Sequence, residues 1–356
     1  MPELRWTEEQ QELAAVLAEL LARHADPAAV RAACTAPRGY DERLWSLLSE
    51  QVGVAGLAVP EEQGGAGFGF VEVAVALEEL GRSLAPSPLL ATTVATQALL
   101  CLDEDAAARF LPDLAAGAST GTLAWSGTTG MPDADIGVTA AGDTLTGSVD
   151  HVLAGDTADV LLVVATGDGG PVLFAVEPGA EGLTRTHTPT MDPTLRLARV
   201  VLDGTPATRL GDATDLLPRV HAAGAAAVAA TATGAARRGL EMTVAYSLER
   251  EQFGRPIGSF QALKHRMADL LVLVETSRSI TLAAALAVAE HDEAPRRTSA
   301  AKAWCDDALE KVAAETVQLH GGIAITWEHD AHLVLKRAHA LRQLFGPAHA
   351  HRRTLL

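Results

Sequence analysis

The segment Arg250-Glu251-Gln252-Phe253-Gly254-Arg255-Pro256-Ile257-Gly258 decides how the C-terminal part of the chain is organised. Its glycines and proline predict a turn between two helices, because glycine permits a tight and irregular backbone. An alanine-dominated helix is expected before it, over 221–248, and three further long amphipathic stretches follow it as far as Leu356. Small residues on the first helix let neighbouring helices approach closely, so we predict an antiparallel four-helix bundle over residues 209–356. These small residues are Gly224, Ala227, Gly234 and Ala235.

The middle of the chain, residues 119–208, has a different pattern. Short β-rich runs alternate with clusters of Gly, Asp and Pro, which is typical of strands joined by turns. The runs cover 144–149, 160–165, 172–176 and 197–202. We therefore expect a small β domain, a barrel or a sandwich, in this part of the chain.

The first part of the chain, residues 1–118, has helical periodicity. Thr7-Glu8-Glu9-Gln10 is a capping box, in which the threonine accepts from a first-turn amide and Gln10 reaches back. A helix is therefore predicted to start there, and helical spacing continues on both sides of the glycine-rich stretch 64–69. The predicted fold class is α+β, with the order helical domain, β domain, helix bundle.

Composition excludes several classes of function. The 356 residues are 48% hydrophobic and 21% charged, which is enough to bury the core of two or three domains. The N-terminus lacks the order of a signal peptide, and no run of about eighteen uncharged apolar residues occurs, so we expect a cytoplasmic protein without membrane association. The net charge of -17 argues against a nucleic-acid partner, because phosphate contacts need clustered Lys and Arg.

The cysteines and the C-terminal basic residues are two groups that could bind a ligand or a metal. The three cysteines are widely separated, so neither a disulfide framework nor a metal site is expected. We expect them to be ordinary buried thiols. Basic residues are dense near the C-terminus, where they could meet an anionic cofactor or a partner, or form a solvated helix face. The cysteines are Cys34, Cys101 and Cys305, and the basic residues are Lys336, Arg337, Arg342, Arg352 and Arg353.

Four stretches, in this order, resemble the acyl-CoA dehydrogenase family along essentially the whole chain. They are "WSLLSEQVGVAGLAVPEEQGGAGFGFVEVAVALEELGRSLAP" (45–86), "TPTMDPTLRLARVVLDG" (188–204), the segment 250–258 followed by Phe260-Gln261, and "QLHGG" (318–322) followed by Thr326 and Glu328. The resemblance implies a flavoprotein that uses FAD to desaturate an acyl-CoA thioester and passes electrons to an electron-transfer flavoprotein.

The last two stretches also carry binding chemistry. A protein that holds FAD needs a cation, amide donors and close backbone approach to the pyrophosphate and adenosine. Arg250 offers a planar donor fork, and Phe253 offers a flat apolar face. The resemblance implies that these segments reach across a subunit interface to the FAD of a neighbour; the simpler interpretation, that the glycines only shape turns and end helices, is compatible with this role. The implied cofactor-binding residues are Arg250, Gln252, Phe253, Gln261, Gln318, Gly321 and Gly322.

The resemblance fails at the catalytic base. Dehydrogenation needs a carboxylate that removes the α-proton while a hydride leaves the β-carbon. The family places this glutamate in one of two positions, and this chain has Phe345 at one and Gly224 at the other, with Ala225 where an arginine normally follows. No catalytic residue is therefore predicted. Alternative bases are His221, His339, His349 and His351, while Glu328 matches an acid that is structural in the family.

The contacts to the flavin ring also depart from the family. Residues 125–132, "WSGTTGMP", replace a Thr-Glu-Pro-x-x-Gly-Ser segment, and His151-Val152-Leu153 replace a Trp-Ile-Thr strand. Leu153 has no hydroxyl to offer the flavin. The chain thus keeps the half of an FAD site that it would lend to a neighbour and lacks the half for its own.

Three hypotheses follow. The first is the non-catalytic partner of a heteromeric acyl-CoA dehydrogenase, similar to the α2β2 enzymes of actinobacteria that act on bulky acyl-CoA substrates. The second is a homo-oligomeric flavin oxidase or monooxygenase on the same fold, and the third is a scaffold subunit without flavin.

Overall fold

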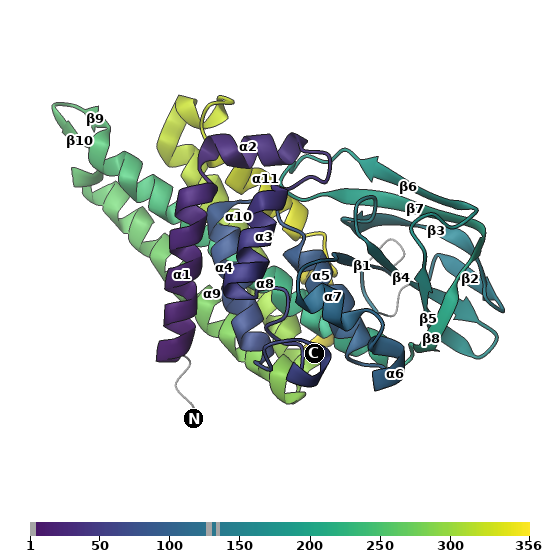
Figure 1. Cartoon of the computed structure of the whole chain (residues 1–356). Coiled ribbons are helices and arrows are strands. Elements are labelled where there is room, and N and C mark those ends of the chain that lie inside the picture. The colour runs from purple at the N-terminus through teal and green to yellow at the C-terminus, as the bar shows by residue number, and fades with distance from the viewer. Residues whose placement is uncertain (1–4, 126–129, 133–135) are drawn as a thin grey trace.

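The computed structural model describes residues 5–125, 130–132 and 136–356, and its three parts lie in the predicted order (Figure 1). The first part is helical, and its first helix begins at the predicted capping box. There the Thr7 amide donates to Gln10 Oε1 over 3.0 Å, and the Gln10 amide donates to Thr7 Oγ1 over 3.3 Å. Its elements are α1 (Glu8–His24), α2 (Pro27–Thr35), α3 (Glu42–Leu47), the π-helical turn η1 (Leu48–Val52), the 3-10 turn η2 (Glu61–Gln63), α4 (Phe70–Ser83), α5 (Leu89–Leu99), α6 (Glu104–Ala107) and α7 (Leu111–Ala115).

The middle part is a mixed sheet that carries its own apolar core. Among the described residues, seven strands pair in the order β6-β7-β3-β2-β4-β5-β8, and β1 joins the same sheet as an eighth strand by pairing in parallel with β4. The strands are β1 (Gly121–Ala124), β2 (Val138–Ala141), β3 (Thr144–Leu153), β4 (Val160–Gly167), β5 (Gly170–Val176), β6 (Leu183–Thr188), β7 (Leu197–Pro206) and β8 (Thr208–Asp212). Pairing thus continues to Asp212, beyond the expected boundary at 208.

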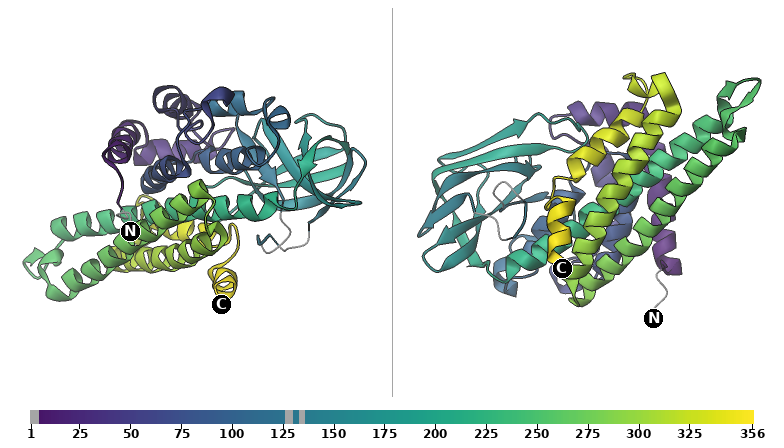
Figure 2. Two further views of the ribbon diagram at one scale, coloured as in Figure 1. Left: turned by 90° about the horizontal axis from the view of Figure 1, so that it is seen from below. Right: turned by 180° about the vertical axis from the view of Figure 1, so that it is seen from behind.

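The C-terminal part is a bundle of long helices, as predicted (Figure 2). The helices α8 and α9 run side by side and meet at a hairpin that projects from the end of the molecule farthest from the sheet. The bounds are α8 (Leu216–Glu249), β9 (Glu251–Gln252), β10 (Arg255–Pro256), the 3-10 turn η3 (Ile257–Ser259), α9 (Gln261–Glu290), α10 (Ala294–His320), the 3-10 turn η4 (Gly321–Ile325), α11 (Ala331–Leu341) and α12 (Ala348–Thr354). Helix α9 is long and apolar enough to cross a membrane by length and composition, but one of its faces packs against α4, α8 and α10, as in a core helix.

Two glycines bring α8 against the N-terminal helices. A Cβ built on Gly234 would come 2.7 Å from the Arg82 amide nitrogen and closer still to the Glu78 carbonyl oxygen. A Cβ on Gly81 of α4 would come 2.9 Å from the carbonyl carbon of Thr231. Gly234 therefore lets α8 pack against the N-terminal domain, whereas the sequence analysis predicts that it packs inside the bundle.

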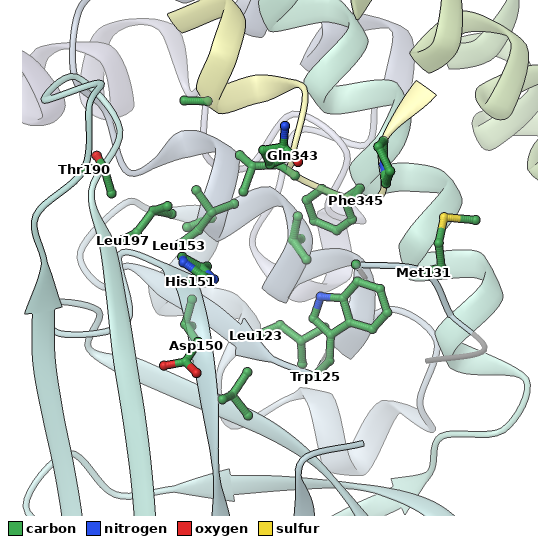
Figure 3. Close-up of a pocket in the computed structure, with 18 of the residues that line it drawn as sticks. Leu123, Trp125, Met131, Asp150, His151, Leu153, Thr190, Leu197, Gln343 and Phe345 are labelled. Carbon is green, nitrogen blue, oxygen red and sulfur yellow. The ribbon is translucent and has the colours of Figure 1, made fainter. Parts of the chain in front are cut away.

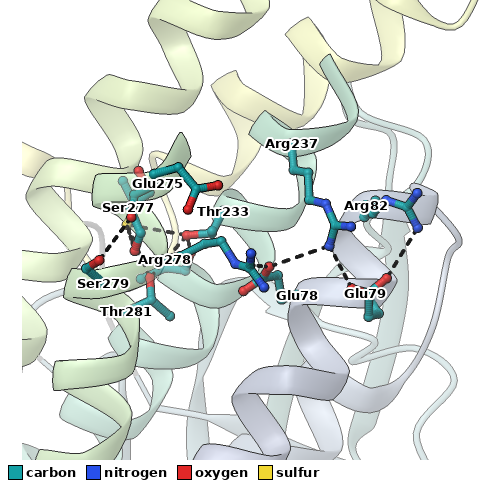
Figure 4. Close-up of polar contacts among 12 residues, drawn as sticks. Glu78, Glu79, Arg82, Thr233, Arg237, Glu275, Ser277, Arg278, Ser279 and Thr281 are labelled. Atoms are coloured by element: carbon teal, nitrogen blue, oxygen red, sulfur yellow. Dashed lines mark hydrogen bonds and ion pairs between the residues drawn. The ribbon is translucent and has the colours of Figure 1, made fainter. Parts of the chain in front are cut away.

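Ion pairs also connect α4 of the N-terminal domain to the helix bundle (Figure 4). Glu78 and Glu79 of α4 are buried against arginines of the bundle. The Arg278 Nε atom lies 3.0 Å from Glu78 Oε1, and an Arg237 guanidinium nitrogen lies 3.0 Å from Glu79 Oε1. Burial raises the pKa of Glu78 to about 7, although Arg278 opposes the rise.

A second buried pair joins the bundle to the sheet. Arg337 of α11 donates through Nε to Asp192 Oδ2 over 2.9 Å and to Thr194 Oγ1 over 3.0 Å. Both charged side chains are almost fully excluded from solvent. The expectation that the C-terminal basic residues form a solvated face or meet an anion is therefore wrong for Arg337, because an internal carboxylate satisfies it. Arg342 and Arg352 pair with Glu310 and Asp307 at the surface of the chain, which agrees with the expected solvated helix face.

Candidate functional site

A cavity of about 920 Å³ lies where the sheet meets α11 and α12 (Figure 3). Its walls come from β1, β3 and β7 and from the turn that joins α11 to α12. An irregularity in the pairing of β3 with β7, between Val149 and Val152, turns His151 towards this space. The apolar interior is lined by Leu123, Trp125, Leu153, Leu197 and Phe345.

The two positions at which a base was sought are in direct contact, and one of them, Phe345, lines this cavity. A Cβ built on Gly224 of α8 would lie 2.6 Å from Phe345 Cζ and closer still to two other ring carbons. The phenyl ring therefore rests directly on the bare backbone of α8. On its other side it stacks with Trp125, with ring centroids 5.9 Å apart. Neither position offers a carboxylate, and the space for one is filled by packed rings.

Buried polar groups hold the turn that carries this ring. Phe345 and Gly346 both have a positive φ, 54° and 89°, which is unusual for an aromatic residue. The Phe345 carbonyl accepts from His351 Nε2 over 2.7 Å and from His221 Nε2 over 3.1 Å. The Gly346 carbonyl accepts from Lys302 Nζ over 3.2 Å. These bonds fix the turn, and hence the phenyl ring over Gly224.

Lys302 forms a fully buried ion pair with Asp306, one turn along α10. Burial raises the pKa of Asp306 to about 6, and the charge of Lys302 only partly opposes this rise. The same burial lowers the pKa of Lys302. Sequence reasoning missed this pair; its i,i+4 spacing was visible, but the same spacing is common on solvated helix faces.

The buried histidines do not have the chemistry of a base. A carbonyl oxygen only accepts, so both His221 and His351 carry their proton on Nε2 and donate it to Phe345. Burial lowers the pKa of His221 to about 3 and that of His351 to about 4. Both are therefore neutral scaffolding groups at neutral pH. Of the other candidates, His339 and His349 line the cavity with exposed side chains, and Glu328 is exposed beyond η4.

The cavity wall does not fit a flavin ring in the family's manner. His151 and Leu153 face the space, and Trp125 fills part of it. The donors expected there, a threonine hydroxyl on the strand and a Thr-Glu-Pro segment before it, have no counterpart among these described residues. Ser126 to Thr129 of the replaced segment lie outside the described residues.

The residues of the second half-site all lie on the surface, on the hairpin side of the bundle. Arg250, Gln252 and Phe253 belong to the hairpin, and Phe253 is 92% exposed. Gln318 ends α10, next to the glycines of η4, where an added Cβ would meet nothing within 4 Å. Gly321, at a positive φ of 64°, is the C-cap of α10, so it has a structural role that is compatible with the predicted contact to a cofactor. Donors, an apolar face and an open backbone therefore fit an adenosine diphosphate group held by another chain.

This set is separate from the cavity within one chain. Figures 1 and 2 place the hairpin at the far end of α8 and α9, away from the sheet. The structure thus brings together Phe345 and Gly224, the two positions at which a base was sought, and leaves the predicted cofactor residues, including Gln261 at the start of α9, on another surface.

The order helical domain, β domain, helix bundle is that of the acyl-CoA dehydrogenase fold. Residues 7–118 match the model of the acyl-CoA dehydrogenase N-terminal domain, and residues 221–356 match that of the C-terminal domain. The chain belongs to the acyl-CoA dehydrogenase family.

Individual relatives resemble the chain along its length. It is 44% identical to acyl-CoA dehydrogenase IpdE2 of Mycobacterium tuberculosis, over 95% of this chain and 93% of the relative. The solved ChsE4-ChsE5 complex of Mycobacterium tuberculosis contains a chain with a TM-score of 0.91 and 30% identity, covering 99% of this chain and 97% of that one. The Tcur3481-Tcur3483 steroid ACAD G363A variant gives a TM-score of 0.89 and 34% identity, covering 98% of this chain and 96% of that one.

Proposed function

We propose that this chain is the non-catalytic partner subunit of a heteromeric acyl-CoA dehydrogenase. In this assembly a companion subunit supplies the glutamate, the contacts to the flavin ring and most of the acyl pocket. Two of the similar solved structures, ChsE4-ChsE5 and Tcur3481-Tcur3483, each carry the names of two different chains. The complex desaturates an acyl-CoA thioester and passes electrons to an electron-transfer flavoprotein, in the cytoplasm.

One observation carries the proposal: the Phe345 ring occupies the space above Gly224, so both positions from which a carboxylate could act are closed together. Proton abstraction at the α-carbon needs a base within hydrogen-bond reach of that proton. The neutral histidines behind the ring point their N–H groups at a backbone carbonyl instead. This chain therefore needs another subunit for the chemical step.

The exposed set on the bundle is this chain's own contribution. When bound, FAD accepts the hydride that leaves the β-carbon. Arg250 would hold the pyrophosphate by its donor fork, and Phe253 would cover the adenosine with an apolar face. Gln252, Gln261 and Gln318 would donate amide hydrogens, while Gly321 and Gly322 would allow close approach of the backbone.

The test is co-expression with an acyl-CoA dehydrogenase-like companion from a neighbouring gene. We expect about one FAD per pair of subunits, with acyl-CoA oxidation only in the mixture. Arg250→Ala should lower the FAD content of the complex. Arg296→Ala is the matched control, because Arg296 is an exposed arginine of α10 outside the proposed contact.

The other outcomes distinguish the alternatives. Full FAD loading of the chain expressed alone would favour a homo-oligomeric oxidase or monooxygenase. Unchanged FAD content in the Arg250→Ala complex would favour a scaffold without a cofactor role.

A further inference from the structure

The cavity at the junction of sheet and bundle persists although its base position is filled. Its volume of about 920 Å³ lies within the range of about 300–1,000 Å³ for small-molecule sites. The Phe345 ring closes one end, and apolar side chains of three strands line the interior, among them Leu123, Leu153 and Leu197 (Figure 3). An apolar body of drug-like size is the occupant that these walls favour.

The mouth of the cavity has a different character. Arg353, His349 and His339 lie there with exposed side chains. Among the described residues, Arg353 makes no ion pair, whereas its neighbour Arg352 is bound to Asp307. An unpaired cation at an apolar cavity stands out in a protein of net charge -17.

The acidic residues that line the cavity each lie close to an arginine. Asp192 is buried and bound to Arg337 over 2.9 Å. Asp150 lies 3.6 Å from Arg199. Each of these carboxylates has an arginine partner, so Arg353 is the one charged lining residue without an opposite charge among the described residues.

We propose that this cavity binds an amphipathic carboxylate, with its apolar body against the sheet and its charge at Arg353. Binding is reversible and involves no chemical step, because neither position 224 nor position 345 offers a carboxylate to the ligand. The cavity is formed by this chain alone and lies apart from the predicted FAD contact. Carboxylate binding can therefore be tested independently of the proposed function.

Dodecanoate is the probe, titrated into the full-length chain below its micelle concentration. Calorimetry should show saturable binding, and Trp125 should report it by a change in fluorescence, since it lines the cavity. In Trp125→Phe the change in fluorescence should shrink while calorimetric binding remains. Dodecyltrimethylammonium, which has the same tail with the opposite charge, should bind more weakly.

Matched variants locate the two ends of the ligand. Arg353→Gln should weaken binding about three- to fivefold, the effect expected of an exposed ion pair of up to about 1 kcal/mol. Arg352→Gln should leave it unchanged, because Arg352 does not line the cavity. Leu153→Trp, which fills the interior, should weaken binding more than tenfold; circular dichroism and the unfolding midpoint verify its fold.

Three results would overturn the proposal. These are no saturable binding of dodecanoate, equal binding of the cationic analogue, and equal effects of Arg352→Gln and Arg353→Gln. Dodecanoyl-CoA tests whether the ligand is a free acid or a CoA ester. Binding of the thioester without binding of the free acid would assign the cavity to a CoA ester and reject the carboxylate site.

Discussion

Replacing Lys302 by methionine isolates the charge that holds the Phe345–Gly346 turn. The variant keeps most of the side-chain volume but leaves Asp306 buried without its cation. Breaking a buried pair in this way typically costs about 3–5 kcal/mol when the remaining group is charged. It also removes the donor to the Gly346 carbonyl. We expect a loss of this size in the free energy of unfolding at pH 8.

The loss should depend on pH with a definite sign. Burial already raises the pKa of Asp306 to about 6 in the folded protein, and loss of the cation raises it further. The folded variant therefore binds a proton that the unfolded chain has released, so its stability falls as pH rises, by up to about 1.36 kcal/mol per unit. At pH 5 the carboxyl is protonated in the folded state, and the cost should be much smaller.

Urea unfolding of both proteins at pH 5 and pH 8, followed by far-UV circular dichroism, measures these differences. The double variant Lys302→Met/Asp306→Leu is the control. It should recover most of the lost stability at pH 8, because an apolar pair of similar volume leaves no buried charge. An equal loss at the two pH values, or no recovery in the double variant, would refute this account of the turn.

Three further outcomes are expected. Gly234→Ala should lower the unfolding free energy by about 1–3 kcal/mol in urea titrations, because its Cβ would press on the backbone of α4 at Glu78. Arg337→Met should cost about 3–5 kcal/mol by leaving Asp192 buried and unpaired, whereas Arg342→Met, at a half-exposed pair, should cost about 1 kcal/mol or less. Glu78→Gln should gain stability relative to the parent as pH rises from about 4.5 to 7, since the folded pKa of about 7 makes ionisation there unfavourable; parallel melts across this range test the sign.

Local signals predicted much of the fold. Thr7 and Gln10 form the expected capping box, and the first bundle helix extends beyond the predicted 221–248 at both ends. The strands are confirmed where β-rich runs were seen, as in β4 and β5. These features depend on neighbours in sequence, which a pattern can show.

Contacts between distant residues were harder to predict. The sequence showed that Phe345 and Gly224 lack a carboxylate, but not that the ring of one rests on the backbone of the other. Lys302 and Asp306 have the spacing of an ordinary surface pair, and only the tertiary packing buries them. Cys34 and Cys101 were expected to be buried and are half-buried. Burial is set by the whole fold, so no local pattern contains it.

The contact between the Phe345 ring and Gly224 leaves no room for a carboxylate at position 224 while the ring stays in place. A glutamate introduced at position 224 alone would collide with the Phe345 ring, because even a Cβ has no room there. A glutamate at position 345 would lie in a turn that is held by hydrogen bonds from Lys302 and His351, and the stacking of Phe345 on Trp125 would be lost. Either substitution would cost stability before it could supply a base, so packing by itself opposes a carboxylate at both positions.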